Sequence, residues 1–222
     1  MRLERPILCL VTDRRRLTGG DETFETARVR LAQMARDAVE AGIDLIQVRE
    51  RDIETAGLVA LVSELVAIAR GSTTRIIVND RVDVALACGA NGVHLGSDSI
   101  APAAARSIAP PGFLVGRSVH ELAEAVEHAP AVDYLIAGTV FPTLSKPAAD
   151  RLLGESGLRR IAAAVRVPVL AIGGVTVELV PAIAASGASG VAGIGLFLPS
   201  AMSMRTAAVA VRAQFDRVGT AS

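Results

Sequence analysis

Side chains capable of chemistry recur directly after short runs of apolar residues along this chain. They include amides, guanidinium groups, a carboxylate, hydroxyls, an ammonium group and a histidine, and two glycine-rich turns follow the last runs. In order they are Gln47 and Arg49, Asn79 and Asp80, Ser118 and His120, Thr143, Ser145 and Lys146, Gly173 and Gly174, and Gly193 and Gly195. Groups of these kinds can bind phosphate, hold a divalent cation and transfer a proton.

Two stretches predict anion sites. Gly173-Gly174 precedes a predicted helix, and Gly193-Ile194-Gly195 follows one unit later, so backbone N–H groups can bind a phosphate there without side-chain charge. Ordinary tight turns would explain the same glycines. The loop with Thr143, Ser145 and Lys146 offers two hydroxyls and an ammonium group, with a solvated loop as its alternative.

A guanidinium and a carboxylate need partners. Arg49 lies within an apolar strand, where it requires Glu50, Asp80 or an anionic ligand. Asp80 can bind Mg²⁺, an ion that keeps several waters and uses few protein ligands. It can equally cap the helix expected from Val82.

The three histidines differ in their expected surroundings. His94 lies inside an apolar strand and is expected to be a packed core residue, and His128 is expected at the surface. His120 directly follows a strand and is the best placed for proton transfer near neutral pH, with a role at the helix start as the alternative.

Eight strand–helix units must position these groups. The strands are expected at 7–12, 43–49, 75–79, 92–95, 113–117, 134–137, 167–172 and 190–195. The helices are expected at 23–41, 54–70, 82–88, 101–108, 122–128, 157–165, 177–185 and 201–215. Continuous apolar strands are typical of parallel strands buried on both faces. The pattern predicts one (β/α)8 TIM barrel, an α/β fold, over residues 1–222, with function at the C-terminal ends of the strands. An open doubly wound sheet is less favoured, since the first turn lacks GxGxxG.

Composition excludes several partners. Lys plus Arg equals Asp plus Glu at 23 each, and aromatic residues make up 3%, so a nucleic-acid partner is not expected. Cys9 and Cys88 lie in apolar runs outside any metal-ligand spacing and are expected to be reduced, structural thiols. Without a signal peptide or a membrane-spanning run, the protein is expected to be soluble and cytoplasmic, with no membrane partner. Whether it forms a homo-oligomer stays open.

The strand-end motifs together resemble the superfamily of thiamine phosphate synthases and TenI-type thiazole tautomerases. The resemblance is carried by QVRER (47–51), VNDRVD (78–83), GVHLG (92–96), GTVFPTLSK (138–146) and AIGG (171–174). It implies that a synthase would join hydroxymethylpyrimidine pyrophosphate to a thiazole phosphate with Mg²⁺. Positions that hold pyrophosphate or pyrimidine would be Gln47, Arg49, Asn79, Thr143, Ser145 and Lys146. Asp80 would be a metal ligand, Gly174 a phosphate-binding position and Ser118 an active-site serine.

Three positions depart from the synthase pattern. Arg51 replaces a lysine, Ser99 replaces a second metal-binding aspartate, and Gly195 replaces a serine. Asp98 is one position away from the missing carboxylate, and whether it restores the metal site stays open. Loss of one of two carboxylates removes a full charge from a Mg²⁺–pyrophosphate site.

These departures favour the tautomerase branch. By resemblance, that branch uses the histidine of a Ser-Val-His stretch, here Ser118, Val119 and His120, to move a proton. We expect a thiazole phosphate tautomerase without a cofactor, with His120 and Ser118 as catalytic residues. Gln47, Arg49, Arg51, Asn79, Thr143, Ser145, Lys146, Gly173, Gly174, Ile194 and Gly195 would bind a small-molecule thiazole phosphate. The alternative is a Mg²⁺-dependent thiamine phosphate synthase with Asp80 on the metal, and a ligand-binding regulator ranks third.

Overall fold

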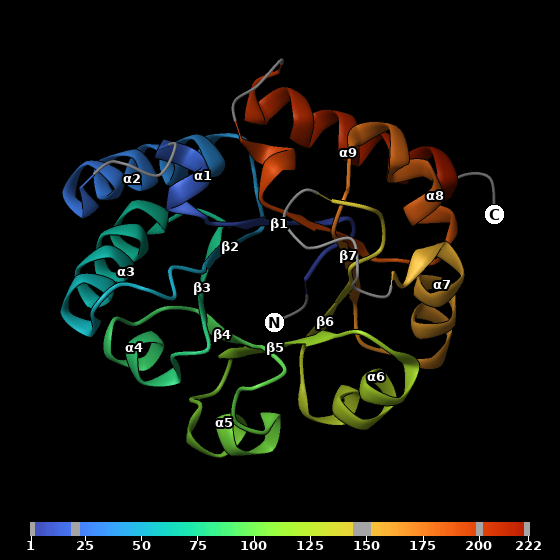
Figure 1. The fold of residues 1–222 in the computed structure, drawn as a ribbon, viewed down its shortest axis with the longest axis horizontal. Coiled ribbons are helices and arrows are strands. Elements are labelled where there is room, and N and C mark those ends of the chain that lie inside the picture. Colours follow the sequence, from blue (N-terminus) through green and yellow to red (C-terminus); the bar gives the residue numbers. More distant parts are fainter. Residues whose placement is uncertain (1–2, 19–22, 144–151, 199–201, 220–222) are drawn as a thin grey trace.

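Eight parallel strands close into a barrel in the computed structural model (Figure 1). The strands follow one another in sequence order, and β1 pairs with β8 to complete the ring. They are β1 (Ile7–Val11), β2 (Leu45–Val48), β3 (Arg75–Asn79), β4 (Gly92–Leu95), β5 (Leu114–Val119), β6 (Tyr134–Gly138), β7 (Val169–Ile172) and β8 (Gly190–Gly193). The structure describes residues 3–18, 23–143, 152–198 and 202–219. The predicted (β/α)8 TIM barrel is confirmed.

Helices surround the barrel, as Figure 1 shows. They are α1 (Arg14–Thr18), α2 (Phe24–Glu40), α3 (Thr55–Ala69), α4 (Val82–Ala87), α5 (Pro102–Ile108), α6 (Leu122–His128), α7 (Gly154–Ala164), α8 (Val180–Ala185) and α9 (Met204–Gly219). Short 3₁₀ turns lie at η1 (Ala129–Ala131), η2 (Val177–Leu179) and η3 (Gly195–Phe197). Most expected helices are present with ends shifted by a few residues.

Two apolar layers hold the barrel together. The inner layer fills the barrel with side chains such as Ile7, Cys9, Leu45, Leu114 and Tyr134. The outer layer packs the opposite faces of the strands against the helices. Because successive strand residues point to opposite faces, both faces are apolar, which explains the continuous apolar runs.

The differences from the expected elements lie at strand ends. β2 ends at Val48 and β8 at Gly193, so Arg49 and Gly195 lie just beyond their strands rather than inside them. β5 continues to Val119, which places Ser118 within the strand. The short helix α1 was not expected, and it lies in the connection between β1 and α2. The expected start of the last helix, at 201, lies outside the described residues.

Across the part of the chain that the structure describes, no helix has both the length and the apolarity needed to cross a membrane.

Candidate active site

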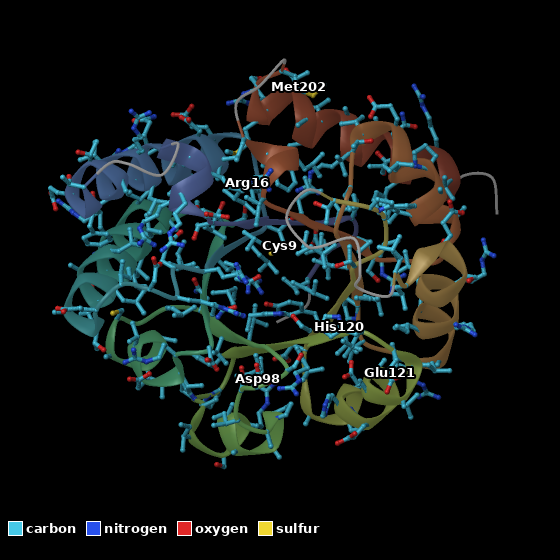
Figure 2. The ribbon with its side chains drawn as sticks, in the orientation of Figure 1. Cys9, Arg16, Asp98, His120, Glu121 and Met202 are labelled. Atoms are coloured by element: carbon cyan, nitrogen blue, oxygen red, sulfur yellow. The ribbon has the colours of Figure 1, made fainter. Side chains whose placement is uncertain are left out.

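A cavity of about 1010 Å³ opens at the C-terminal ends of the strands. All described candidate residues line it: Gln47, Arg49, Arg51, Asn79, Asp80, Ser118, His120, Thr143, Gly173, Gly174, Ile194 and Gly195. Ser145 and Lys146 lie outside the described residues. In Figure 2, Asp98 and His120 lie on the β4–β5 side of the barrel and Arg16 on the opposite side. One cavity therefore brings together groups from the whole circumference.

A buried amide pair forms part of the cavity wall. Gln47 on β2 donates from Nε2 to Oδ1 of Asn79 on β3, over 3.0 Å. Both residues are buried and line the cavity. The bond fixes both side chains and leaves Asn79 Nδ2 to donate to a ligand.

Arg49 is a half-buried cation at the cavity wall. The candidate partner Glu50 is already engaged, since it accepts from Thr12 Oγ1 at 2.7 Å and from Arg14 Nη1 at 3.1 Å. Within the described chain, the Arg49 guanidinium has no hydrogen bond or ion pair. Burial and the neighbouring charge of Arg51 lower the pKa of Arg49. Two cations at one wall leave an anionic ligand as the partner that the geometry favours.

Asp80 lines the same cavity, and its carboxylate forms no ion pair or hydrogen bond with the described residues. Its backbone is in the left-handed region with φ of 66°, where its N–H donates to His94 O at 2.8 Å. Non-glycine residues adopt this region rarely, and such outliers cluster at functional sites. The structure does not have Asp80 as the cap of α4, because the N-cap residue is Arg81, whose side chain makes no capping hydrogen bond.

A buried histidine lies at the floor of the cavity. His94 is 2% exposed, and its Nε2 lies 2.8 Å from Ser118 Oγ while its Nδ1 lies 3.3 Å from Tyr134 Oη. Burial, with the charges of Arg117 and Arg49, lowers its pKa to about 3, so the ring is neutral near pH 7. His94 is thus a core residue, as expected, and also a cavity residue, which its apolar sequence context concealed.

His120 is exposed at the cavity rim. Its Nδ1 is hydrogen-bonded to Gly138 O, and its backbone N–H donates to Glu124 Oε2 at 2.6 Å. Because a carbonyl can only accept, Nδ1 carries the proton and Nε2 of the neutral ring is left as an acceptor.

His128, which was expected at the surface, is instead mostly buried, with only 17% of its side chain exposed.

The glycine turns combine close packing with access to the cavity. A Cβ on Gly174 would lie 2.3 Å from Pro142 O, and one on Gly173 would lie 2.4 Å from Thr139 Cγ2. These two glycines, both with positive φ, are therefore needed by the packing of the loop after β7 against the loop after β6. Gly195 differs, because among the described residues its Cβ would meet only Arg16, at 3.8 Å from Nη2.

Arg16 is a cavity residue that the sequence reasoning missed. It belongs to α1, which is tied to the loop after β2 by Arg14 hydrogen bonds to Glu50 and Asp52. Its guanidinium lies over the turn at Gly195, where it adds a positive charge to the predicted phosphate site. The available signal was the run of three arginines directly after the first strand.

The loop after β4 carries Ser99, where the resemblance to synthases implies a carboxylate. Ser99 Oγ accepts a hydrogen bond from Gly96 N at 2.7 Å and so closes a turn of its own loop. Asp98 lines the cavity and has no ion pair within the described residues. Among all the residues that the structure describes, no group of three or more His, Cys, Asp or Glu side chains is arranged to hold a metal ion.

Comparison with known proteins identifies the family. A family model described as thiamine monophosphate synthase matches residues 8–197. The chain belongs to the thiamine monophosphate synthase family.

Relatives in the thiamine monophosphate synthase family agree in name. A thiamine-phosphate synthase of Methanoregula boonei is 46% identical over 72% of this chain and 75% of its own. One of Methanoculleus marisnigri is 39% identical over 87% of this chain and 95% of its own. The solved structure of a thiamine phosphate pyrophosphorylase from Pyrococcus furiosus aligns with a TM-score of 0.79 and 34% identity, covering 96% of each chain. These names favour the synthase, the alternative, over the tautomerase that the sequence led us to expect.

Proposed function

We propose that this protein is a thiamine phosphate synthase, which joins a thiazole phosphate to hydroxymethylpyrimidine pyrophosphate. In this reaction a bond forms between the thiazole nitrogen and the pyrimidine methylene carbon, and the bond from that carbon to the pyrophosphate oxygen breaks. The observation that carries the proposal is the 46% identity to a protein named as this synthase. The cavity also supports the proposal, because every described candidate residue lines this cavity.

The proposed pyrophosphate end is the wall formed by Arg49, Arg51 and Asp80. Arg49 has lost its candidate partner Glu50 to Thr12 and Arg14, so the two arginines can compensate the charge of a pyrophosphate. Gln47 and Asn79 are fixed to one another beside this wall and can donate to ligand oxygens or ring nitrogens.

The donor set fits Mg²⁺ bound together with a substrate. Mg²⁺ uses one or two carboxylates plus substrate phosphates, and Asp80 offers one carboxylate without an ion pair in the described chain. Asp98 lines the same cavity as a candidate second carboxylate. When bound, the ion would neutralise charge that develops on the leaving pyrophosphate.

The proposed phosphate end is the pair of turns after β7 and β8. Gly173, Gly174, Ile194 and Gly195 line the cavity there, and Arg16 lies over Gly195. Backbone amides and one guanidinium can bind the thiazole phosphate at this end, which leaves the ring nitrogen free to face the pyrimidine.

Tautomerisation of a thiazole phosphate is the second candidate activity. One arrangement favours it: His120 lines the cavity with Nδ1 bonded to Gly138 O, and its Nε2 has no hydrogen bond to a described residue. Ser99 in place of a carboxylate also weakens the case for the metal-dependent reaction.

One assay separates the two activities. We expect the purified protein, given both synthase substrates and Mg²⁺, to form thiamine phosphate and pyrophosphate, and EDTA to abolish this. Failure to form thiamine phosphate, together with EDTA-resistant turnover of the thiazole tautomer that falls about 10²-fold in His120→Ala, would instead establish the tautomerase.

A further inference from the structure

A hydrogen-bonded chain crosses three neighbouring strands beneath the cavity. Tyr134 on β6 pairs in register with Gly116 on β5, which pairs with His94 on β4. A Cβ on Gly116 would lie 2.2 Å from Tyr134 Cζ and 2.5 Å from Oη. The missing side chain therefore allows Tyr134 to extend across β5 to His94 Nδ1, and the two ring centroids lie 5.7 Å apart.

The direction of this chain depends on the tautomer of His94. A neutral imidazole has one N–H donor and one acceptor nitrogen. If Nδ1 carries the proton, His94 donates to Tyr134 and accepts from Ser118. If Nε2 carries it, Tyr134 donates to Nδ1, and His94 donates to Ser118 Oγ across 2.8 Å.

The surroundings of Tyr134 distinguish the two tautomers. Its side chain is completely buried, and Nδ1 of His94 is the one hydrogen-bond partner of its hydroxyl among the described residues. An Nδ1–H tautomer would leave the tyrosine proton without an acceptor in an apolar interior, which is costly. Ser118 has no such constraint, because it lines the cavity and can donate to a ligand. Only the Nε2–H tautomer satisfies every group.

We propose that Tyr134 is a positioning residue that holds His94 as the Nε2–H tautomer and thereby turns the hydroxyl proton of Ser118 toward the cavity. His94 cannot then accept a proton from Ser118, so this pair is not a nucleophile with its base. Ser118 acts as a hydrogen-bond donor to an acceptor atom of the ligand. The tautomer is a property of the folded barrel, and only its use in catalysis rests on the proposed function.

The tautomer can be read by nitrogen NMR of protein labelled with ¹⁵N-histidine. Signals of the other two rings are assigned with His120→Gln and His128→Gln. In the wild-type protein near pH 7, we expect the proton of His94 on Nε2 and an unprotonated Nδ1. In Tyr134→Phe, which removes only the hydroxyl, we expect the Nδ1–H form to be populated. In Ser118→Ala, the Nε2–H form should persist, because Tyr134 remains.

Each result decides the proposal without reference to the reaction. A wild-type Nδ1–H tautomer, or an Nε2–H tautomer that Tyr134→Phe leaves unchanged, overturns it. Loss of the Nε2–H form in Ser118→Ala assigns control to Ser118 and overturns it as well. Dispersed methyl signals in each variant show that the barrel is folded, so a folding failure is not mistaken for a tautomer change. A synthase assay on the same samples tests the proposed function separately.

Discussion

At the scale of single residues, Ser99 is the position at which the resemblance to synthases implies a metal-binding carboxylate. Its hydroxyl accepts from Gly96 N, a role that an aspartate side chain can also fill. We predict that Ser99→Asp lowers the Mg²⁺ concentration for half-maximal synthase activity by about three- to tenfold, because it adds a carboxylate to the cavity that Asp80 also lines. Ser99→Asn, equal in size but uncharged, is the matched control. Equal Mg²⁺ dependence in the two variants would show that the charge at this position does not reach the metal.

His94 makes stability depend on pH. Its pKa of about 3 in the folded protein lies below the unfolded value near 6.5, so the unfolded state binds more protons between these values. The stability that neutral, buried His94 contributes to the folded protein is therefore complete above pH 6.5 and is lost as the pH falls toward 3. From pH 7 to pH 5 we predict a loss of about 2 kcal/mol from the free energy of unfolding. Urea unfolding of wild type and His94→Gln at both pH values checks this, and a loss of the same size in His94→Gln would refute it.

At the scale of elements, the two glycine turns should respond differently to a methyl group. Gly174→Ala meets Pro142 O at 2.3 Å in a left-handed backbone, so we predict a loss of stability of about 2 kcal/mol or more. Gly195→Ala meets Arg16 alone among the described residues, so the fold should be retained while the KM for the thiazole phosphate rises. Thermal unfolding and steady-state kinetics separate these outcomes. An unchanged KM in Gly195→Ala would remove this turn from the phosphate site.

Helix α1 offers a second, matched test of the same site. Arg16 lies over Gly195, whereas its neighbour Arg15 forms an exposed ion pair with Asp52. We predict that Arg16→Ala raises the KM for the thiazole phosphate about tenfold or more, the scale of a lost charge-assisted hydrogen bond. Arg15→Ala should change it little, since exposed ion pairs contribute little. The dephosphorylated thiazole alcohol should show no difference among the three proteins.

At the scale of the whole molecule, the barrel was predictable because its signals are repeated. Apolar runs such as 75–79 and 92–95, each followed by a helix, recur eight times, and parallel order follows from their continuous apolar character. The barrel then places Asn79, Ser118 and Gly174 at one end of the strands, so much of the site followed from the fold.

The features of the site that the sequence did not predict depend on contacts that form only when the barrel closes. Helix α1 is too short for its periodicity to be visible, and Arg16 meets Gly195 only because β1 lies beside β8. The capture of Glu50 by Arg14 and the left-handed backbone of Asp80 likewise arise from the folded loops. The hydroxyl of Tyr134 reaches His94 because Gly116 lies between them in the register of three strands.

The packing of Cys9 inside the barrel makes its thiol a probe of how often the barrel opens. Cys9 lies on β1 between β8 and β2, near the centre of Figure 2, and its thiol is completely buried inside the barrel, where burial raises its pKa to about 12. Thiolates rather than thiols react with alkylating reagents, so Cys9 should be labelled only during excursions that separate the strands. Cys88, which is partly exposed, should be labelled first and mark the start of the reaction. Mass spectrometry can follow the addition of the alkylating reagent to Cys9 at several urea concentrations. The rate of this second addition would report how often the strands of the closed barrel separate. Rapid labelling of both thiols in native buffer would mean that the barrel opens locally around Cys9 without unfolding.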